Sequence, residues 1–135
     1  MGFVGWSDYL LNAGLKHIHN EATFTEPDSY LAAFIGNPLA AGVEVTGGSY
    51  ARQTVTWNGV AAGVNEYTDE NTGEIAFPEA TGDWGSISHV ATFDALTVGN
   101  MLEVFELSTA RNVVTGIVLK VKDGEIDSYV KRESI

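Results

Sequence analysis

Cysteine is absent from this 135-residue sequence, basic residues are scarce, and long hydrophobic runs are missing. Without cysteine there is no disulfide framework, no cysteine-based zinc site, no iron–sulfur cluster and no thiol nucleophile. Seven Lys and Arg oppose 18 Asp and Glu, which gives a formal net charge of −11. A field of that sign repels nucleic acids and anionic membranes, and no apolar run reaches the roughly 18 residues of a spanning helix. We therefore expect neither nucleic acid nor a membrane as a partner.

The composition is that of an ordinary folded domain. Hydrophobic residues make up 44% of the chain and charged residues 19%, which argues against disorder. The length fits one domain on the usual scale of roughly 100 to 200 residues. The first eight residues have neither the basic nor the apolar part of a secretory signal. We expect a single domain over residues 1–135, with a short N-terminal arm (residues 1–6) and a C-terminal tail (residues 128–135).

The local patterns predict a mainly β protein. Fifteen glycines and many short runs of Val, Thr, Tyr and Phe favour strands separated by turns. Their spacing predicts an antiparallel β-sandwich or barrel-like domain. Residues 7–20 differ, because their apolar residues recur at helical spacing behind a capping Ser7 and predict one short N-terminal helix. We expect packing of its apolar face to hold this helix; the face comprises Leu10, Leu11, Leu15 and Ile18.

The strands and turns can be placed more closely. Asp123 and Gly124 form a strong type I′ hairpin signal, which predicts that residues 125–130 return beside the strand before them. The acidic stretch 66–71 predicts an exposed hairpin or loop and lacks the residue spacing of a calcium loop. The expected strands cover residues 30–35, 43–45, 50–57, 86–93, 101–107 and 113–121.

Catalytic motifs are not found in the sequence. There is no phosphate-binding loop, no metalloprotease helix and no serine-hydrolase elbow. His89 has apolar neighbours on its strand face and no Asp or Ser at a triad-like position, which predicts a structural histidine. His17 and His19 would point to different sides of a helix and so would not share a metal. The acidic residues allow accidental pairs for glycoside hydrolysis, without a sequence signature. We predict a protein that is not an enzyme and uses no cofactor or metal.

Basic residues are concentrated in the last quarter of the chain, which holds five of the seven. On an acidic protein this asymmetry predicts a face directed toward an acidic partner surface. The alternative is that these charges protect an exposed strand edge from pairing. Together with two N-terminal aromatic residues they form the predicted partner interface: Phe3, Trp6, Arg111, Lys120, Lys122, Lys131 and Arg132.

Two segments carry a recognisable pattern. Residues 45–53 read Val-Thr-Gly-Gly-Ser-Tyr-Ala-Arg-Gln, and residues 75–85 read Ile-Ala-Phe-Pro-Glu-Ala-Thr-Gly-Asp-Trp-Gly. With the helix near Ser7, this order resembles a family of small tailed-bacteriophage virion proteins, often labelled tail-fibre or minor tail proteins. The resemblance extends from about Ser7 to Asp127. Its motif residues are Gly47, Gly48, Tyr50, Ala51, Arg52, Phe77, Pro78, Asp83, Trp84 and Gly85.

The physical chemistry of these motif residues indicates a structural role. Phe77 and Trp84 flank a turn, and we expect both to anchor the core. Pro78 would end a strand at a sheet edge. Arg52 is expected to pair with a carboxylate such as Asp83.

The resemblance implies a non-enzymatic structural protein of a phage virion, assembled in the host bacterial cytoplasm. Small size and acidity favour a capsid decoration or cement protein. The expected partners are the major capsid protein or other virion proteins, and further copies of this chain in a homotrimer. The alternative is a tail-fibre or baseplate tip protein that binds a host glycan, with Tyr67 or Trp57 stacking on sugar rings. Removal of residues 1–6 or of residues 131–135 is expected to weaken particle binding while the domain still folds.

Overall fold

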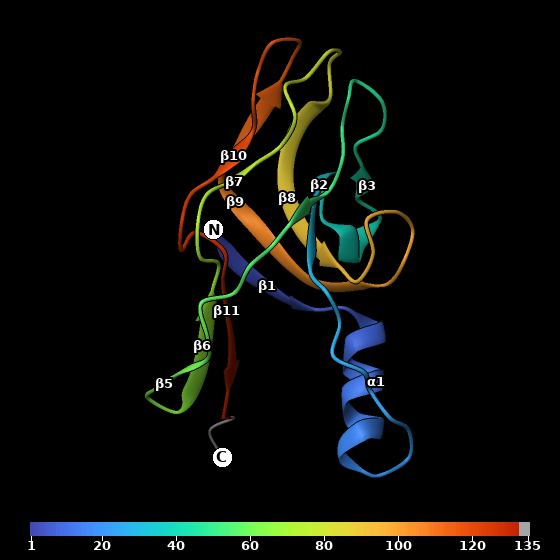
Figure 1. Cartoon of the computed structure of the whole chain (residues 1–135), viewed down its shortest axis with the longest axis vertical. Helices are drawn as coiled ribbons and strands as arrows, with labels where there is room; N and C mark the ends of the chain where they lie inside the picture. Colours follow the sequence, from blue (N-terminus) through green and yellow to red (C-terminus); the bar gives the residue numbers. More distant parts are fainter. Residues whose placement is uncertain (133–135) are drawn as a thin grey trace.

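The structure is a computed structural model that describes residues 1–132, and most of its regular elements are antiparallel strands (Figure 1). The helical elements are α1 (Asp8–Ile18) and the 3-10 turn η1 (Pro38–Ala40). The strands are β1 (Gly2–Trp6), β2 (Tyr30–Ile35), β3 (Val43–Glu44), β4 (Gln53–Thr54), β5 (Ala61–Gly63), β6 (Glu66–Glu70), β7 (Ile75–Ala76), β8 (Gly85–Phe93), β9 (Met101–Val113), β10 (Lys120–Val121) and β11 (Asp127–Lys131).

Three antiparallel sheets organise these strands. The largest has six strands in the order β1-β9-β8-β2-β3, with β4 also paired to β2. The others are the two-stranded sheet β10-β7 and the three-stranded sheet β11-β6-β5. The prediction of a mainly β, antiparallel, sandwich-like fold with one N-terminal helix is confirmed. Within residues 1–132 no helix has the length and apolarity needed to cross a membrane.

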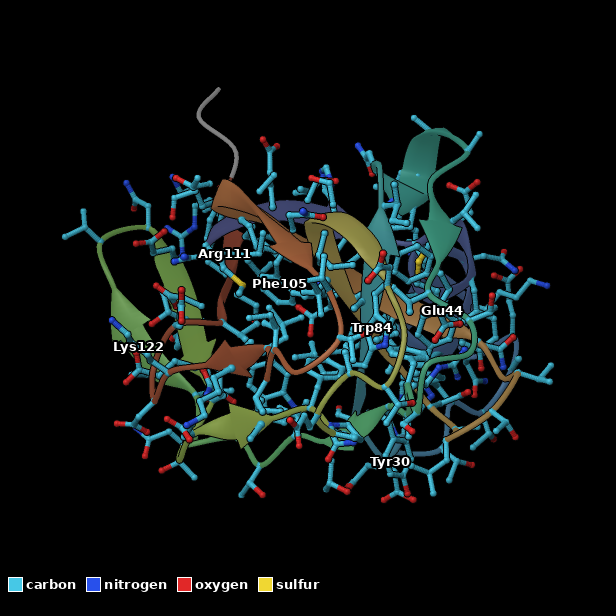
Figure 2. All side chains as sticks on the ribbon, turned by 90° about the horizontal axis from the view of Figure 1, so that it is seen from above. Tyr30, Glu44, Trp84, Phe105, Arg111 and Lys122 are labelled. Atoms are coloured by element: carbon cyan, nitrogen blue, oxygen red, sulfur yellow. The ribbon has the colours of Figure 1, made fainter. Side chains whose placement is uncertain are left out.

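The main core lies between the large sheet and the layer that contains β7 and β10. Strand β2 is buried on both faces, because Leu31 and Ala33 belong to this core while Ala32 and Phe34 belong to a second cluster. Complete burial of a large apolar side chain contributes about 1.5–3 kcal/mol. Figure 2 shows Phe105 and Trp84 inside the molecule. The largest fully buried apolar side chains are Phe77, Phe105, Leu31, Ile87, Ile126, Val90, Val104, Val113 and Val121.

Helix α1 begins as predicted, but most of its apolar face is exposed. The Ser7 hydroxyl accepts a hydrogen bond from the Leu10 backbone N–H at 3.1 Å, which satisfies one free donor of the first turn. No residue of α1 is buried; Leu11 is 53% exposed and Ile18 72%. Of the predicted apolar face only Leu10 is half-buried, beside β1 and β9, so packing covers less of the helix than expected. Figure 1 shows the reason, since α1 extends beyond the large sheet.

The predicted N-terminal arm is part of the large sheet. Residues 2–6 form β1, which pairs with β9 and places Phe3 opposite Phe105. The ring of Phe3 also packs against Phe105, with centroids 5.4 Å apart, and against Tyr129 at 5.1 Å. Deletion of residues 1–6 would expose the edge of β9 and part of the core. The expectation that this deletion leaves folding intact is corrected accordingly.

The predicted C-terminal tail is likewise ordered over its first residues. Strand β11 pairs with β6 over five residues, from Asp127 opposite Glu70 to Lys131 opposite Glu66. The last part of the predicted tail, residues 133–135, lies outside the described residues. Residues 128–131 are thus a sheet strand in the structure.

Two predicted strands are shorter than expected. In the segment 50–57 only Gln53 and Thr54 form a strand, β4, and Trp57 adds an isolated bridge with Asn71. The side chains of Tyr50 and Arg52 bond across to Glu44. In the segment 113–121 the chain turns after β9 at Gly116, whose φ is 91°, and resumes only as the two-residue β10. Side-chain and loop contacts replace the continuous ladder in both places.

The predicted hairpin at Asp123–Gly124 does not form, and Asn71 explains why. This residue is 1% exposed, and its side-chain amide donates to the carbonyl of Lys122 and accepts from the backbone of Ile126. Its own carbonyl accepts from the Gly124 N–H at 2.9 Å. The turn therefore wraps around Asn71, and β10 pairs with β7 while β11 pairs with β6.

Candidate functional site

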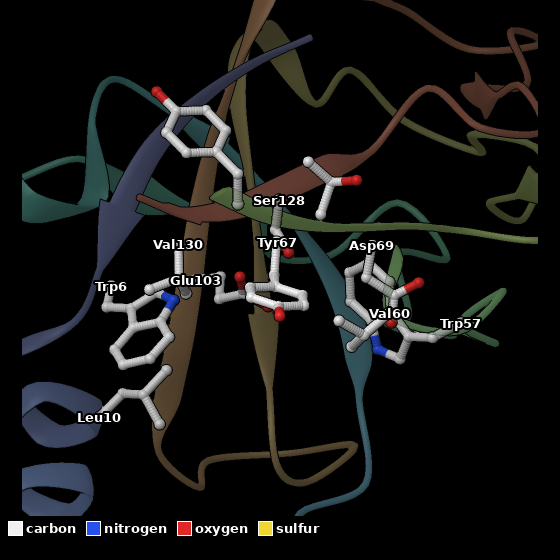
Figure 3. Close-up of a pocket in the computed structure, with 11 residues that line it drawn as sticks. Trp6, Leu10, Trp57, Val60, Tyr67, Asp69, Glu103, Ser128 and Val130 are labelled. Carbon is white, nitrogen blue, oxygen red and sulfur yellow. The ribbon is translucent and has the colours of Figure 1, made fainter. Parts of the chain in front are cut away.

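A cavity of about 280 Å³ opens where α1, β1 and the three-stranded sheet meet (Figure 3). Strands β6, β9 and β11 supply most of its wall, and the loop before β5 closes one end. We call it the aromatic pocket. Its lining residues are Trp6, Leu10, Trp57, Val60, Tyr67, Thr68, Asp69, Glu103, Ser128, Tyr129 and Val130.

Three aromatic side chains dominate the labelled residues of the aromatic pocket. In Figure 3, the Tyr67 side chain lies between those of Trp6 and Trp57, and the Glu103 side chain lies beside it. Tyr67 is 61% exposed, so its ring is available to a ligand. The indole of Trp57 is half-buried and donates to the Ser29 hydroxyl at 3.1 Å, which fixes its orientation. Fixed and exposed aromatic rings suit the apolar face of a ligand.

Glu103 supplies a carboxylate in this largely apolar setting. Burial raises the pKa of Glu103 above its ordinary value, and the nearby Asp69 charge adds to that rise. Hydrogen bonds from the side chains of Ser128 and Trp6 act in the opposite direction and do not cancel it. The loss of water around this carboxylate is therefore incompletely compensated.

Asp69 shapes the other end of the pocket. Its Oδ1 atom accepts from the backbone N–H groups of Gly59 and Glu70, both at 2.9 Å. The Asn58 N–H donates to the Glu70 carbonyl at 2.9 Å, and Trp57 forms a bridge with Asn71. These contacts hold the loop that carries Trp57. Among residues 1–132, no group of three or more His, Asp or Glu is arranged to hold a metal ion.

The pocket contains residues that the sequence singled out and others that it did not. Tyr67 and Trp57, the two predicted sugar-stacking residues, line it together, and so does Trp6 from the predicted partner interface. Glu103 was not selected. Its signal lies in strand alternation, because it shares a strand face with Met101 and other apolar residues of 101–107.

The two motif segments form one aromatic cluster on the core side of the large sheet. Tyr50 lies with its ring centroid 5.4 Å from Trp84 and 6.1 Å from Phe77, and the latter two are 6.3 Å apart. The Trp84 indole donates to the Gly48 carbonyl at 2.9 Å. Gly48 has φ 57°, and an added Cβ would stand 2.8 Å from the Trp84 ring nitrogen, so a side chain does not fit there.

The remaining motif residues lie around this cluster. Gly47 has a positive φ of 74° in the turn before Tyr50, and Ala51 is exposed beside it. Pro78 follows two residues after β7 ends, close to the predicted position. Gly85 opens β8 with φ 97°, where an added Cβ would meet the Ile35 side chain at 2.9 Å.

The predicted pairing of Arg52 with Asp83 is wrong. Arg52 instead pairs with Glu44, through Nη2 to Oε1 at 2.8 Å and Nε to Oε2 at 2.9 Å. Its Nη1 atom also donates to the carbonyls of Ala95 and Val98, and its guanidinium lies 3.8 Å from the Phe93 ring centroid. Asp83 instead accepts from the Thr115 backbone at 3.3 Å. The fork geometry of Arg52 suits the bidentate pairing that forms.

The predicted interface residues do not share one surface. Arg111, Lys120 and Lys122 line a concavity of about 120 Å³ between β9 and β10, whereas Lys131 and Arg132 line a different one beside β6. Figure 2 shows Arg111 and Lys122 on the side of the molecule away from Glu44. Their role as a partner interface stays a prediction.

His89 has polar neighbours that its sequence context did not reveal. Its Nδ1 lies 2.8 Å from the Ser88 hydroxyl, and its Nε2 lies 3.7 Å from Glu106. The Ser88 oxygen also accepts from the Gly36 N–H at 2.9 Å, which ties β8 to the end of β2. The expectation of no serine near His89 is corrected. These contacts connect neighbouring strands and fit the structural role predicted for this histidine.

The mainly β architecture defines a small, single-helix β protein with an open surface pocket. A family model described as "Podophage GP4 fiber I protein gp80" matches residues 5–128. The chain belongs to this family of phage fibre proteins and is thus a structural component of a virion. The match supports the sequence-based resemblance. No curated protein matches the chain.

Proposed function

We propose that this protein is a fibre subunit that binds a saccharide of the host cell surface in the aromatic pocket. The observation that carries the proposal is the combination, in one cavity of about 280 Å³, of four aromatic residues with the half-buried carboxylate of Glu103. Sugar rings present apolar C–H faces and hydroxyl groups. Trp6, Trp57 and Tyr67 offer surfaces for the former, and Glu103 an acceptor for the latter.

The family description favours this fibre interpretation over a capsid decoration protein. A fibre lies where a virion meets its host, and a pocket on such a subunit has access to cell-surface polysaccharide. Contacts with other virion proteins are expected for any fibre subunit. The homotrimer and the major capsid protein as partner stay predictions. A count of copies per virion distinguishes a place in the capsid shell from a place in a fibre, since a shell protein occurs in hundreds of copies and a fibre subunit in far fewer.

Substitution of Tyr67 tests the pocket directly. Tyr67→Ala removes the most exposed ring of the aromatic pocket, and Tyr9→Ala, on α1 outside the pocket, is the matched control. Isothermal titration with chitotetraose, a neutral oligosaccharide, is expected to show about tenfold weaker binding for Tyr67→Ala, equivalent to ~1.4 kcal/mol. The control should bind as the unmodified protein does. Equal affinities for all three proteins would contradict the assignment of the pocket.

The same mixtures test the prediction that the protein is not an enzyme. Chitotetraose incubated with the protein should be recovered at full length by mass spectrometry. Shortened products that disappear in a Glu103→Gln variant would show hydrolysis by the pocket carboxylate and contradict the binding role.

A further inference from the structure

We infer that the aromatic pocket discriminates by charge, taking neutral or amino-bearing saccharides and excluding those that carry carboxylates. This inference rests on the proposed function, and it concerns which class of saccharide the pocket takes. It follows from the kinds of charge that face the cavity and from how each charge is held.

Both charged residues that line the pocket are acids. Glu103 stands on the β9 wall and Asp69 on the β6 wall. Within the described part of the chain, none of the lining residues is a lysine or an arginine. A ligand carboxylate would thus enter a cavity that already holds two acidic groups and offers no positive partner.

The neighbouring cation is already engaged. Lys131 follows the lining residue Val130, but its ammonium lies 3.9 Å from a Glu66 carboxylate oxygen and 4.8 Å from the Tyr129 ring centroid. It does not line the pocket. Rotation of Lys131 toward a ligand would give up both contacts. The nearest cation is thus paired with an acid of its own chain and is not part of the pocket wall.

The two acids also cannot move away from a ligand without cost. Asp69 is fixed by two backbone N–H groups, and Glu103 is half-buried in the β9 wall of the pocket. Partial burial weakens the screening that water and salt provide at an open surface. An anionic ligand consequently meets a fixed repulsive field. A ligand amine meets two acceptors and three aromatic faces, which favour a cation.

Four oligosaccharides of equal length test this discrimination in titrations at one ionic strength. Chitotetraose is neutral, its de-acetylated form carries amines, and tetragalacturonate carries carboxylates. Fully methyl-esterified tetragalacturonate has the same sugar ring as tetragalacturonate without the charge. We expect the neutral and amino-bearing chains to bind, and esterification of tetragalacturonate to tighten binding at least about tenfold, because removal of the ligand charge removes the repulsion.

Variants show whether the pocket acids cause the difference. Glu103→Gln keeps the side-chain shape and should reduce the ratio of the affinities for the ester and for tetragalacturonate several-fold. Asp69→Asn should also reduce this ratio. Glu26→Gln is the control, because it removes one charge from an exposed residue outside the pocket. If Glu26→Gln reduces the ratio as much as Glu103→Gln does, the net charge of −11 causes the effect and the inference is wrong.

The outcomes separate this inference from the proposal on which it rests. Equal affinity for tetragalacturonate and its ester, with binding weakened by Tyr67→Ala, would overturn the charge discrimination and leave a saccharide pocket standing. Absence of binding by all four oligosaccharides would count against the saccharide function itself, and with it against the inference.

Discussion

Glu44 and Glu103 are both partly buried carboxylates, but their surroundings differ in the number of donors. Burial opposes ionisation of Glu44, yet hydrogen bonds from Arg52 and Tyr50 and the Arg52 charge outweigh it, so the pKa of Glu44 is lowered. Glu103 faces a cavity, and burial raises its pKa despite donors from Ser128 and Trp6. The Glu44 carboxylate is fully used by hydrogen-bond donors of its own chain, whereas the Glu103 carboxylate can still accept a hydrogen bond.

This difference separates a structural site from a binding site. Glu44 accepts from Tyr50 and from Arg52, and Arg52 in turn donates to the carbonyls of Ala95 and Val98. The cluster thereby connects β3 to the loop between β8 and β9. At Glu103 the neighbouring groups border open space. A polar group that is left incompletely satisfied beside a cavity is a common feature of sites that bind a ligand.

The largest expected effect on the free energy of unfolding is at the Arg52–Glu44 pair. Arg52→Ala removes a side chain that is 8% exposed and leaves Glu44 without its charged partner. Loss of one member of a buried ion pair costs about 3–5 kcal/mol. Urea unfolding should show a loss of at least about 3 kcal/mol in the free energy of unfolding. A loss below about 1 kcal/mol would mean that this cluster does not stabilise the fold.

The two carboxylates should also respond to pH with opposite sign. Glu44 has a lowered pKa in the folded protein, so its contribution to stability is present above its unfolded pKa of about 4.3 and is lost as pH falls through the folded value. Glu103 has a raised pKa, so its contribution is fully present below about 4.3 and is lost as pH rises through the folded value. Each residue can be isolated by its glutamine variant.

The free energies of unfolding of the Glu44→Gln and Glu103→Gln variants, measured from pH 3 to pH 7, test this prediction. Glu44→Gln should be less stable than the unmodified protein at pH 7, by about 2 kcal/mol, and the gap should shrink in acid. Glu103→Gln should be at least as stable at pH 7, with a gain within about 1 kcal/mol that disappears in acid. If the two variants shift stability in the same direction at pH 7, the contrast between the two sites does not hold.

The smallest effect is expected at an exposed acid outside both sites. Glu106 lies 3.7 Å from His89, and its side chain is 63% exposed. Surface pairs of this kind contribute between about 0 and 1 kcal/mol. Glu106→Gln should therefore change the free energy of unfolding by less than about 0.5 kcal/mol at pH 7. A larger loss would show that solvent exposure alone does not separate Glu106 from Glu44.

Local sequence patterns predicted the local structure well. Ser7 and the apolar spacing after it located the start of α1, and the glycine pair before Tyr50 located a turn with positive φ. Such features depend on neighbours within a few residues. The fold class followed from the same short-range signals, because short strands and glycine-rich turns recur along the chain.

Long-range pairing was not accessible in the same way. Asp123 and Gly124 do form a turn, and Gly124 has φ 72°. Asn71 bonds to both sides of this turn, and the strands before and after it belong to different sheets. The partner of Arg52 was likewise decided by the fold, which brings Glu44 closer than Asp83. The aromatic pocket combines Trp6, Trp57 and Tyr67, which only tertiary structure unites.

The three tryptophans provide the most direct test of a saccharide pocket. The side chains of Trp6 and Trp57 line the pocket, whereas Trp84 is buried outside it, with its indole N–H bonded to the Gly48 carbonyl. Titration with chitotetraose, followed by the three indole resonances in a ¹H–¹⁵N NMR spectrum, should shift those of Trp6 and Trp57 and leave that of Trp84 in place. Three unchanged resonances at saturating sugar, or a shift of Trp84 alone, would contradict the account.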